Sequence, residues 1–216
     1  MTPLLRNMAL SGGLLALFAV LGTTLVALTA ASTEERIEEN QRAATLTTLH
    51  ELVPPQRYDN DPVDDSIRVT APRALGSPEP LPVYRLRREG EPVAAVLTVE
   101  APDGYGGPIR LLIGVEPDGA VVGVRVVSHS ETPGLGDAIE ARRSDWIHSF
   151  AGRSLGDPPR EQWTVERDGG AFDQFTGATI TPRAVVHAVR RALVYFEENR
   201  EMLFARSPAE GGESHE

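Results

Sequence analysis

An uncharged N-terminal segment constrains this chain more than any other feature of its sequence. No ionisable side chain occurs from Asn7 to Thr33, and most of the segment is Leu, Ala, Val, Gly and Thr. A helix of about 20 apolar residues crosses the hydrocarbon core of a membrane, so this segment is long enough to span it with some tilt. Small residues at Ala27, Ala30 and Ala31 leave a cleaved signal peptide as the alternative. The apolar run is longer than a usual signal-peptide core, which favours an uncleaved transmembrane anchor.

The charges beside this segment predict its orientation. Arg6 and the amino terminus precede it, whereas acidic residues such as Glu34 and Glu35 follow it. Positive flanks stay in the cytoplasm. We therefore expect residues 1–33 to form a cytoplasmic N-terminus and a single-pass anchor, with the globular part on the far side of the membrane.

The rest of the chain is acidic. Because Arg6 is the only charged side chain before Glu34, the remainder of the 216 residues carries 20 basic and 31 acidic residues. This charge disfavours binding to nucleic acid or to an anionic lipid surface. Cysteine is absent, which excludes disulfides, iron–sulfur ligation and thiolate zinc sites within the chain.

Residues 34–84 predict a juxtamembrane helix followed by a loop. Residues 34–50 are rich in Glu, Gln, Ala and Leu with a thin apolar stripe that includes Ile37, and Pro54-Pro55 ends the helix. Residues 56–82 contain several Asp and Pro and predict a loop with short strands. The small, polar and acidic residues 207–216 predict a disordered tail.

Residues 85–206 predict one α+β domain with a mainly antiparallel sheet and a C-terminal helix. The candidate strands are residues 93–99, 109–115, 121–127 and 163–167. Asp103-Gly104 and Asp118-Gly119 are typical of turns in antiparallel hairpins. A short helix is expected over residues 137–143. A longer helix is expected over residues 182–204, where apolar residues recur at three- and four-residue steps.

The segment from Asp173 to Thr179 has the pattern D-x-x-[ST]-G-A-T and directly precedes the last predicted helix. Gly177 and Ala178 leave the backbone uncrowded, so a bulky group can approach the hydroxyl of Thr179. Thr181 before a proline is typical of an N-cap, which would place a phosphate on Thr179 near free N–H groups at a helix start. The alternative is a loop that only caps the helix.

Two further loops are rich in glycine, at residues 104–109 and 129–136. In the second, glycines at 134 and 136 allow the backbone to lie close to a flat ring, and Glu131 and Thr132 offer polar contacts. A tight turn with a solvated glutamate is the alternative.

In this order behind a single span, the three segments resemble the FMN-binding domain family. The resemblance rests on Gly-Tyr-x-Gly-Pro-Ile at 104–109, Glu-Thr-Pro-Gly-Leu-Gly at 131–136 and Asp-x-x-Thr-Gly-Ala-Thr at 173–179. Within the family the chain is similar to the G subunits of Rnf (also called Rsx) electron transport complexes. The C subunit of a sodium-pumping NADH:quinone reductase is the alternative. A non-redox scaffold domain tethered to the membrane is the alternative of another class.

The resemblance implies a cofactor, partners and a location. FMN would be joined to Thr179 through a phosphoester bond by a flavin transferase that uses FAD and magnesium and recognises Asp173. The chain would be a redox subunit without turnover of its own, together with other membrane subunits in a bacterial inner membrane, its domain in the periplasm. Such complexes couple ferredoxin–NAD chemistry to ion movement or keep a redox sensor reduced. An enzyme that binds FMN reversibly is an intermediate option.

The expected cofactor site combines the glycine-rich loop with the segment before the last helix. The residues expected at its phosphate end are Thr176, Gly177, Ala178, Thr179 and Thr181, and those expected near the isoalloxazine ring are Glu131, Thr132, Gly134 and Leu135. Trp146, Phe150 and Trp163 are more typical of a core than of a wall beside the ring. No catalytic residue and no metal site is predicted, since the five histidines are scattered and His129 with Glu131 is a weak metal pair.

Overall fold

The computed structural model describes residues 3–205, apart from the side chains of residues 4–6, 9, 30–35, 37 and 38. The predicted tail at 207–216 and the side chain of Ile37 lie outside the described part. The chain consists of two compact units, residues 1–45 and residues 46–216.

One helix, α1 (Pro3–Leu52), makes up the first unit and contributes its last turns to the second. Its 50 residues correspond to a length of about 75 Å. The segment Leu10–Thr29 is long and apolar enough to cross a membrane, and the rest of the protein buries none of it. A signal sequence has the same properties, so this helix fits both interpretations of the N-terminus. The predicted polar helix is confirmed as a continuation of α1, which ends just before Pro54.

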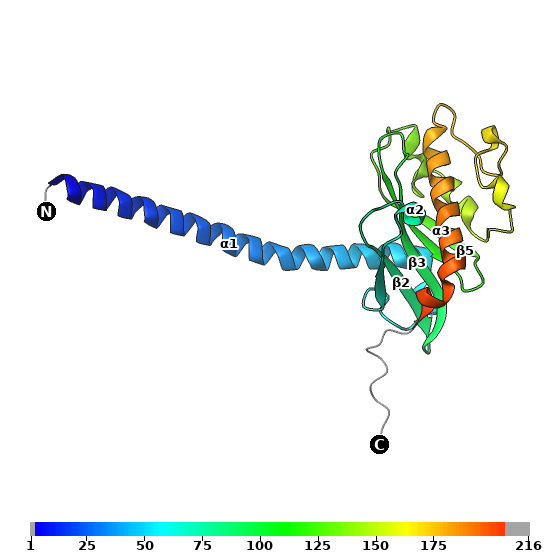
Figure 1. Ribbon diagram of the computed structural model, residues 1–216, viewed down its shortest axis with the longest axis horizontal. Helices are drawn as coiled ribbons and strands as arrows, with labels where there is room; N and C mark the ends of the chain where they lie inside the picture. The colour runs from blue at the N-terminus through cyan, green and yellow to red at the C-terminus, as the bar shows by residue number, and fades with distance from the viewer. Residues whose placement is uncertain (1–2, 206–216) are drawn as a thin grey trace, which may run out of the picture. The chain divides into compact units, whose positions relative to one another are not determined.

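The second unit is built on a five-stranded antiparallel sheet in which each strand pairs with its neighbour in sequence (Figure 1). The strands are β1 (Ser66–Val69), β2 (Leu81–Arg88), β3 (Glu91–Ala101), β4 (Ile109–Val115) and β5 (Val121–Ser128). The predicted strands at 93–99, 109–115 and 121–127 are confirmed as parts of β3, β4 and β5. The turns that join them contain the two predicted Asp-Gly pairs, so the expected hairpins form.

The sequence does not predict β2, because its residues break the apolar–polar alternation of a half-buried strand. Pro82 is its second residue, and Arg85 and Arg87 are 2% and 5% exposed. Both arginines pair with Asp65. Their guanidinium groups also donate to carbonyl oxygens at the end of α3 (Ile180–Phe204): Arg87 Nη2 lies 3.0 Å from the oxygen of Phe204. Cations at a helix C-terminus satisfy its free carbonyls and favour its dipole.

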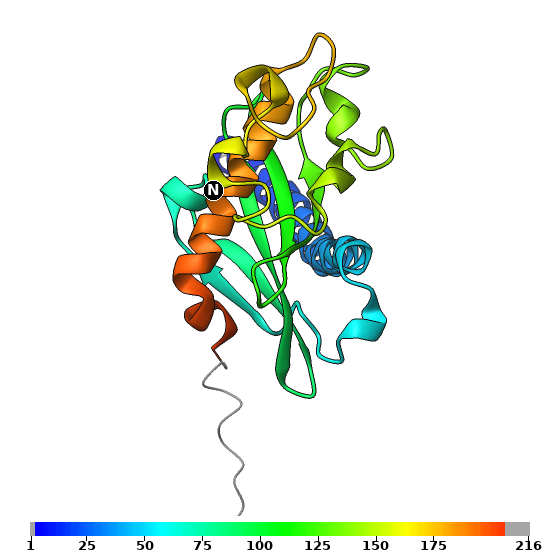
Figure 2. The ribbon, with the colours of Figure 1, turned by 90° about the vertical axis from the view of Figure 1, so that its right-hand side faces the viewer.

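Both faces of the sheet are covered. On one face, α3 buries Val185, Val189 and Phe196 against a core that includes Leu97 and Ile113. On the other face, the last turn of α1 covers a smaller apolar cluster, and Figure 2 shows the end of α1 and α3 on opposite sides of the sheet. This second cluster consists of Leu49, Leu52, Val53, Leu86, Ala94, Val96 and Leu112. Each fully buried aliphatic or aromatic side chain contributes about 1.5–3 kcal/mol, so residues 46–53 are part of the folded domain.

The remaining elements are short. They are α2 (Pro72–Leu75), η1 (Pro55–Arg57), η2 (Gly136–Ile139), η3 (Trp146–Phe150), η4 (Arg160–Gln162) and η5 (Glu166–Asp168). The predicted helix at 137–143 is only the four-residue 3-10 turn η2. The predicted strand at 163–167 is wrong, because η5 turns the chain there and a single bridge joins Val165 to Phe172. Trp163 and Val165 are apolar because they belong to the buried interior, not because they alternate along a strand.

Candidate functional site

The last helix begins two residues earlier than its sequence suggests, and this changes the position of two threonines. α3 starts at Ile180, so Thr179 is its N-cap residue and Thr181 lies inside the first turn. The predicted N-cap at Thr181 is therefore wrong, and its hydroxyl donates to the carboxylate of Glu131 instead. Thr179 makes no capping hydrogen bond, and its hydroxyl has no hydrogen-bond partner among residues 3–205. That oxygen is free to bond to another group.

A tight turn delivers Thr179 to this position. The amide of Ala178 donates to the carbonyl of Phe175 at 3.1 Å, which closes the loop on itself. Gly177 has φ of +84°, in the left-handed region that favours glycine. A side chain at this position would strain the turn, which accounts for the glycine of the motif.

The start of α3 lines one wall of a cavity of about 270 Å³. The opposite wall comes from the two glycine-rich loops. The lining residues are Tyr105, Glu131, Thr132, Leu135, Gly136, Gly177, Ala178, Thr179, Ile180 and Thr181. The structure thus brings together most of the residues expected at the cofactor site.

Some expected residues do not line the cavity, and some lining residues were not expected. Asp173, Thr176 and Gly134 lie on the same loops but outside the wall, whereas Tyr105 and Ile180 line it without having been predicted. Tyr105 belongs to the first glycine-rich segment, so the motif around it is the sequence signal that could have identified it. Ile180 follows the motif and looks from the sequence like an ordinary core residue of the last helix.

Glu131 joins the three segments of the site. It is only 5% exposed. Its carboxylate accepts hydrogen bonds from the amide of Gly106, at 3.0 Å, and from the hydroxyl of Thr181. A Cβ at Gly136 would lie 2.7 Å from the same carboxylate, so glycine is required there for close approach. The glutamate is therefore a structural element of the cavity, not a solvated side chain on a turn.

His129 supports the loop that carries Glu131. Its Nδ1 accepts from the amide of Glu131 at 3.0 Å, and its Nε2 lies 2.9 Å from a carboxylate oxygen of Glu140. An accepting Nδ1 places the ring proton on Nε2. Bonds from Arg142 and then from His129 lower the pKa of Glu140 from 4.5 to about 2. Among residues 3–205, no group of three or more His, Asp or Glu is placed to hold a metal ion.

The mouth of the cavity is apolar and exposed to solvent. Tyr105, Leu135 and Ile180 line it and are 69%, 44% and 46% exposed. Exposed side chains of this size around one opening are uncommon unless they meet another molecule. Their arrangement suits a flat aromatic group that is held at the surface.

Trp146 contacts the loop before Thr179 and does not reach the cavity. Its indole Nε1–H donates to the carbonyl of Asp173 at 2.8 Å, and its ring packs edge-on against Phe175 with centroids 5.2 Å apart. Phe150 and Trp163 are fully buried in the core. The side chain of Asp173 faces solvent, where another protein can reach it.

These features fit FMN. The first turn of α3 presents the amides of Ile180 and Thr181 beside Thr179, and free amides at the start of a helix favour a phosphate. The neighbouring residue, Pro182, has no amide hydrogen to offer. Glycine at 136 and the apolar mouth leave room for a ring system, and Glu131 and Thr132 are polar residues of the same lining.

Comparison with known proteins agrees with this description. The FMN-binding domain family matches residues 104–194, and the RnfG N-terminal region matches residues 1–52. The chain is 53% identical to the G subunit of the ion-translocating oxidoreductase complex of Pseudomonas aeruginosa strain UCBPP-PA14 over 208 residues, which is 96% of this chain and 97% of the relative.

Relatives in other bacteria extend over a similar length. The corresponding G subunit of Shewanella loihica is 46% identical over 201 residues, covering 93% of this chain and 95% of the relative. That of Vibrio atlanticus is 44% identical over 203 residues, covering 94% of this chain and 97% of the relative. The chain belongs to the family of G subunits of ion-translocating oxidoreductase complexes, which are membrane electron carriers with an FMN-binding domain.

Proposed function

We propose that the FMN of this electron carrier is attached covalently to Thr179, and that the domain lies in the periplasm. The observation that carries the proposal is the free hydroxyl of Thr179 in the cavity wall, at the start of a 25-residue helix. A threonine that only caps a helix bonds its own backbone, and Thr179 does not.

The attachment is a group transfer from FAD. The hydroxyl oxygen of Thr179 forms a new bond to the phosphorus of the FMN half, the P–O bond within the pyrophosphate breaks, and AMP leaves. The hydroxyl proton is released to solvent. No oxidant is needed, and magnesium bound by the transferase would neutralise the pyrophosphate charge. Asp173 is exposed on the same loop, which is where a transferase that recognises this residue needs it.

The chain's own residues bind and orient the cofactor. FMN supplies the redox chemistry when bound. Thr179 and the amides of α3 hold the phosphate end. Glu131 fixes the positions of the two loops, and the exposed mouth would leave bound FMN accessible to electron donors and acceptors. Nothing in this arrangement requires an acid–base residue, so we expect no independent turnover.

The experiment is in-gel flavin fluorescence of the full chain, denatured, after expression with the flavin transferase. Thr179→Ala removes the acceptor oxygen. It is expected to abolish both the fluorescence and the mass increase that corresponds to one FMN. Thr132→Ala is the matched control, because it removes a hydroxyl from the same cavity and leaves the acceptor in place. It is expected to retain covalent flavin.

The outcomes separate the alternatives. A Thr179→Ala protein that keeps covalent flavin contradicts the attachment site. A wild-type protein whose flavin is lost on denaturation indicates reversible binding in the same cavity. A wild-type protein without any flavin favours the non-redox scaffold.

A further inference from the structure

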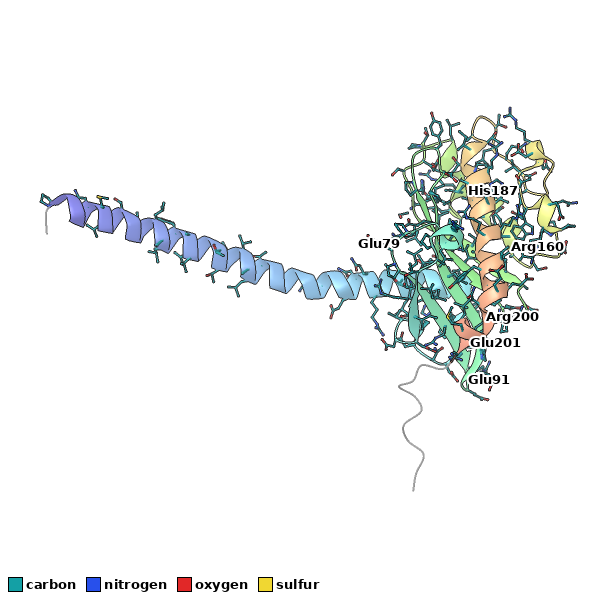
Figure 3. The ribbon with its side chains drawn as sticks, viewed as in Figure 1. Glu79, Glu91, Arg160, His187, Arg200 and Glu201 are labelled. Atoms are coloured by element: carbon teal, nitrogen blue, oxygen red, sulfur yellow. The ribbon has the colours of Figure 1, made fainter. Side chains whose placement is uncertain are left out.

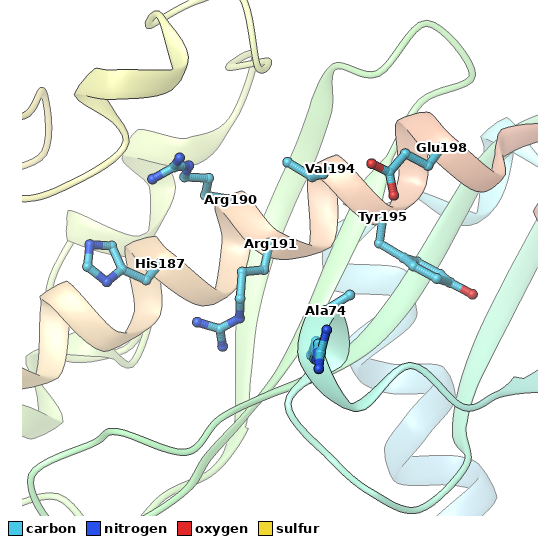
Figure 4. Close-up of a pocket in the computed structure, with 8 residues that line it drawn as sticks. Ala74, His187, Arg190, Arg191, Val194, Tyr195 and Glu198 are labelled. Carbon is cyan, nitrogen blue, oxygen red and sulfur yellow. The ribbon is translucent and has the colours of Figure 1, made fainter.

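A second cavity lies between α2 and the middle of α3. Its volume is about 480 Å³, larger than that of the cofactor cavity. Figure 3 shows His187 on the first half of α3 and Arg200 near its end, and the cavity lies between these two positions. Figure 4 shows side chains from successive turns of α3 along it, with Ala74 of α2 on the facing side. The lining residues are Arg73, Ala74, His187, Arg190, Arg191, Val194, Tyr195 and Glu198. We call this cavity the arginine groove.

The arginine groove carries guanidinium groups without partners. Many arginines of this domain form ion pairs, for example Arg110 with Glu100. In contrast, the side chains of Arg73 and Arg190 are exposed and make no ion pair or hydrogen bond with any residue from 3 to 205. Unpaired guanidinium groups present donors in the fork geometry that binds carboxylates.

Neighbouring charges leave this end of the groove positive. Arg191 is half-buried, and Asp103 is near enough to act on it, but the one hydrogen bond of its guanidinium group within the described residues is long, at 3.5 Å to the carbonyl of Glu100. Burial, then Arg190, Arg191 and Arg183, lowers the pKa of His187, so the histidine is uncharged at neutral pH. The three arginines thus add to the effect of burial in disfavouring a positive charge on His187.

The rest of the groove differs from its positive end. Val194, Tyr195 and Ala74 provide a half-buried apolar floor, and among the described residues Glu198 is the only carboxylate that lines it. Asp168, the other carboxylate near His187, is already bonded by Arg183. A ligand that fits this surface needs a negative group at one end and an apolar part behind it. Arginine and tyrosine are also the residues enriched in protein interfaces.

We propose that the arginine groove docks an acidic segment of another subunit of the same complex. The family is defined as one subunit of a multisubunit complex, so such neighbours exist. An anionic lipid surface is a poorer fit, because an extended surface would face the acidic domain as a whole, whereas a short acidic segment would face the arginines of the groove. A free phosphate would leave the apolar floor uncovered. The proposal does not depend on covalent attachment of FMN.

The test is the recovery of this chain with its complex, solubilised in mild detergent and purified through a tag on a different subunit. Charge reversal in Arg73→Glu with Arg190→Glu is expected to reduce the ratio of this chain to the tagged subunit roughly tenfold at low salt. Neutralisation in Arg73→Gln with Arg190→Gln is expected to give an intermediate ratio. Added salt should lower the wild-type ratio, because ions screen the contact.

The matched control reverses two other accessible arginines, in Arg88→Glu with Arg153→Glu. It changes the net charge equally outside the groove and is expected to leave the ratio at its wild-type value. Covalent flavin and the unfolding temperature are measured on the same samples, so a folding or flavin defect is seen separately. Thr179→Ala is expected to give the wild-type ratio of this chain to the tagged subunit.

Two results overturn the proposal. One is a wild-type ratio in the groove variant, and the other is an equal loss in the control. A photo-crosslinking amino acid in place of Val194 identifies the occupant: an adduct with an acidic segment of a neighbouring subunit supports the proposal, and an adduct with lipid alone contradicts it.

Discussion

Glu131 is the residue through which the two glycine-rich loops and α3 contact one another at the cavity. Its carboxylate is buried and accepts bonds from the amide of Gly106 and the hydroxyl of Thr181. Truncation in Glu131→Ala leaves the buried hydroxyl of Thr181 without a partner away from water, and it removes a bond from the amide of Gly106, which is an exposed residue. Such a loss costs roughly 1–3 kcal/mol per group, so we expect a clearly lower unfolding temperature for the solubilised full chain.

The control for this prediction is Thr132→Ala, at the next and exposed position. It is expected to change the free energy of unfolding by less than about 0.5 kcal/mol. Equal unfolding temperatures for Glu131→Ala and Thr132→Ala would show that the glutamate does not hold the loops together. Flavin content, measured in parallel, reports whether the cavity depends on the same contacts.

Glu140 makes the stability of this region depend on acid. Arg142 and His129 hold its pKa at about 2 instead of 4.5. A lowered carboxylate pKa contributes stability that is fully present above pH 4.5 and is lost as the pH falls toward 2. We expect Glu140→Gln to flatten the fall in unfolding temperature across this window.

Exposed Glu161, for which no ion pair is found among the described residues, provides the matched control. Glu161→Gln should follow the wild-type acid profile. Because Arg142 is largely exposed, the difference between Glu140→Gln and wild type should shrink at high salt. Parallel acid profiles for both variants and the wild type would show that Glu140 does not cause the loss of stability in acid.

Among the secondary-structure elements, η3 contacts the loop that carries Thr179. Trp146 donates to the carbonyl of Asp173 and packs on Phe175, both within the motif. Trp146→Phe keeps an aromatic ring beside Phe175 and removes only the N–H donor. If Thr179 is the acceptor, we expect flavin incorporation by purified transferase, FAD and magnesium to slow severalfold, with a nearly unchanged unfolding temperature.

The control is His148→Phe, at an exposed position of the same element. It should incorporate flavin at the wild-type rate. A wild-type rate in Trp146→Phe would mean that the hydrogen bond to Asp173 does not order the loop for the transferase. A matching loss of stability would instead assign the tryptophan to packing alone.

The elements that the sequence predicts are those with a local cause. Apolar runs bounded by Asp-Gly turns suffice for β3 and β4, period-two alternation suffices for β5, and three- and four-residue spacing suffices for α3. The sequence does not predict β2, because Arg85 and Arg87 are buried only through partners elsewhere in the chain. The prediction of a strand at 163–167 is wrong, because the apolar residues there pack in the core and do not pair with a neighbouring strand.

The residues of the cavity likewise divide into those that local motifs predict and those that depend on the fold. The sequence motifs suffice to predict Glu131 and the residues around Thr179 as parts of one site, because each segment is dense in glycine and hydroxyl groups. Ile180 and Trp146 contribute through contacts that depend on the fold: Ile180 because the helix begins at it, and Trp146 because it bonds a carbonyl 27 residues away. No local pattern marks such residues.

For the whole molecule, the charges that flank α1 predict the side of the membrane on which the domain lies. Arg6 and the amino terminus precede Leu10–Thr29, and an acidic segment follows it, so the positive-inside rule predicts a periplasmic domain. The chain contains no cysteine, which makes single introduced cysteines specific reporters. Ser149→Cys, on the exposed surface of the domain, and Asn7→Cys, before the span, are the two positions to compare.

A membrane-impermeant maleimide applied to cells with a permeabilised outer membrane should label Ser149→Cys and leave Asn7→Cys unlabelled. After lysis, Asn7→Cys should be labelled on the full-length chain, because an uncleaved anchor keeps this residue, whereas signal-peptide cleavage would remove it. Labelling of Asn7→Cys before lysis would indicate the opposite orientation, with Thr179 in the cytoplasm. Since one pair of variants reports both orientation and cleavage, it decides whether the flavin domain is anchored at the membrane by α1 or released from it.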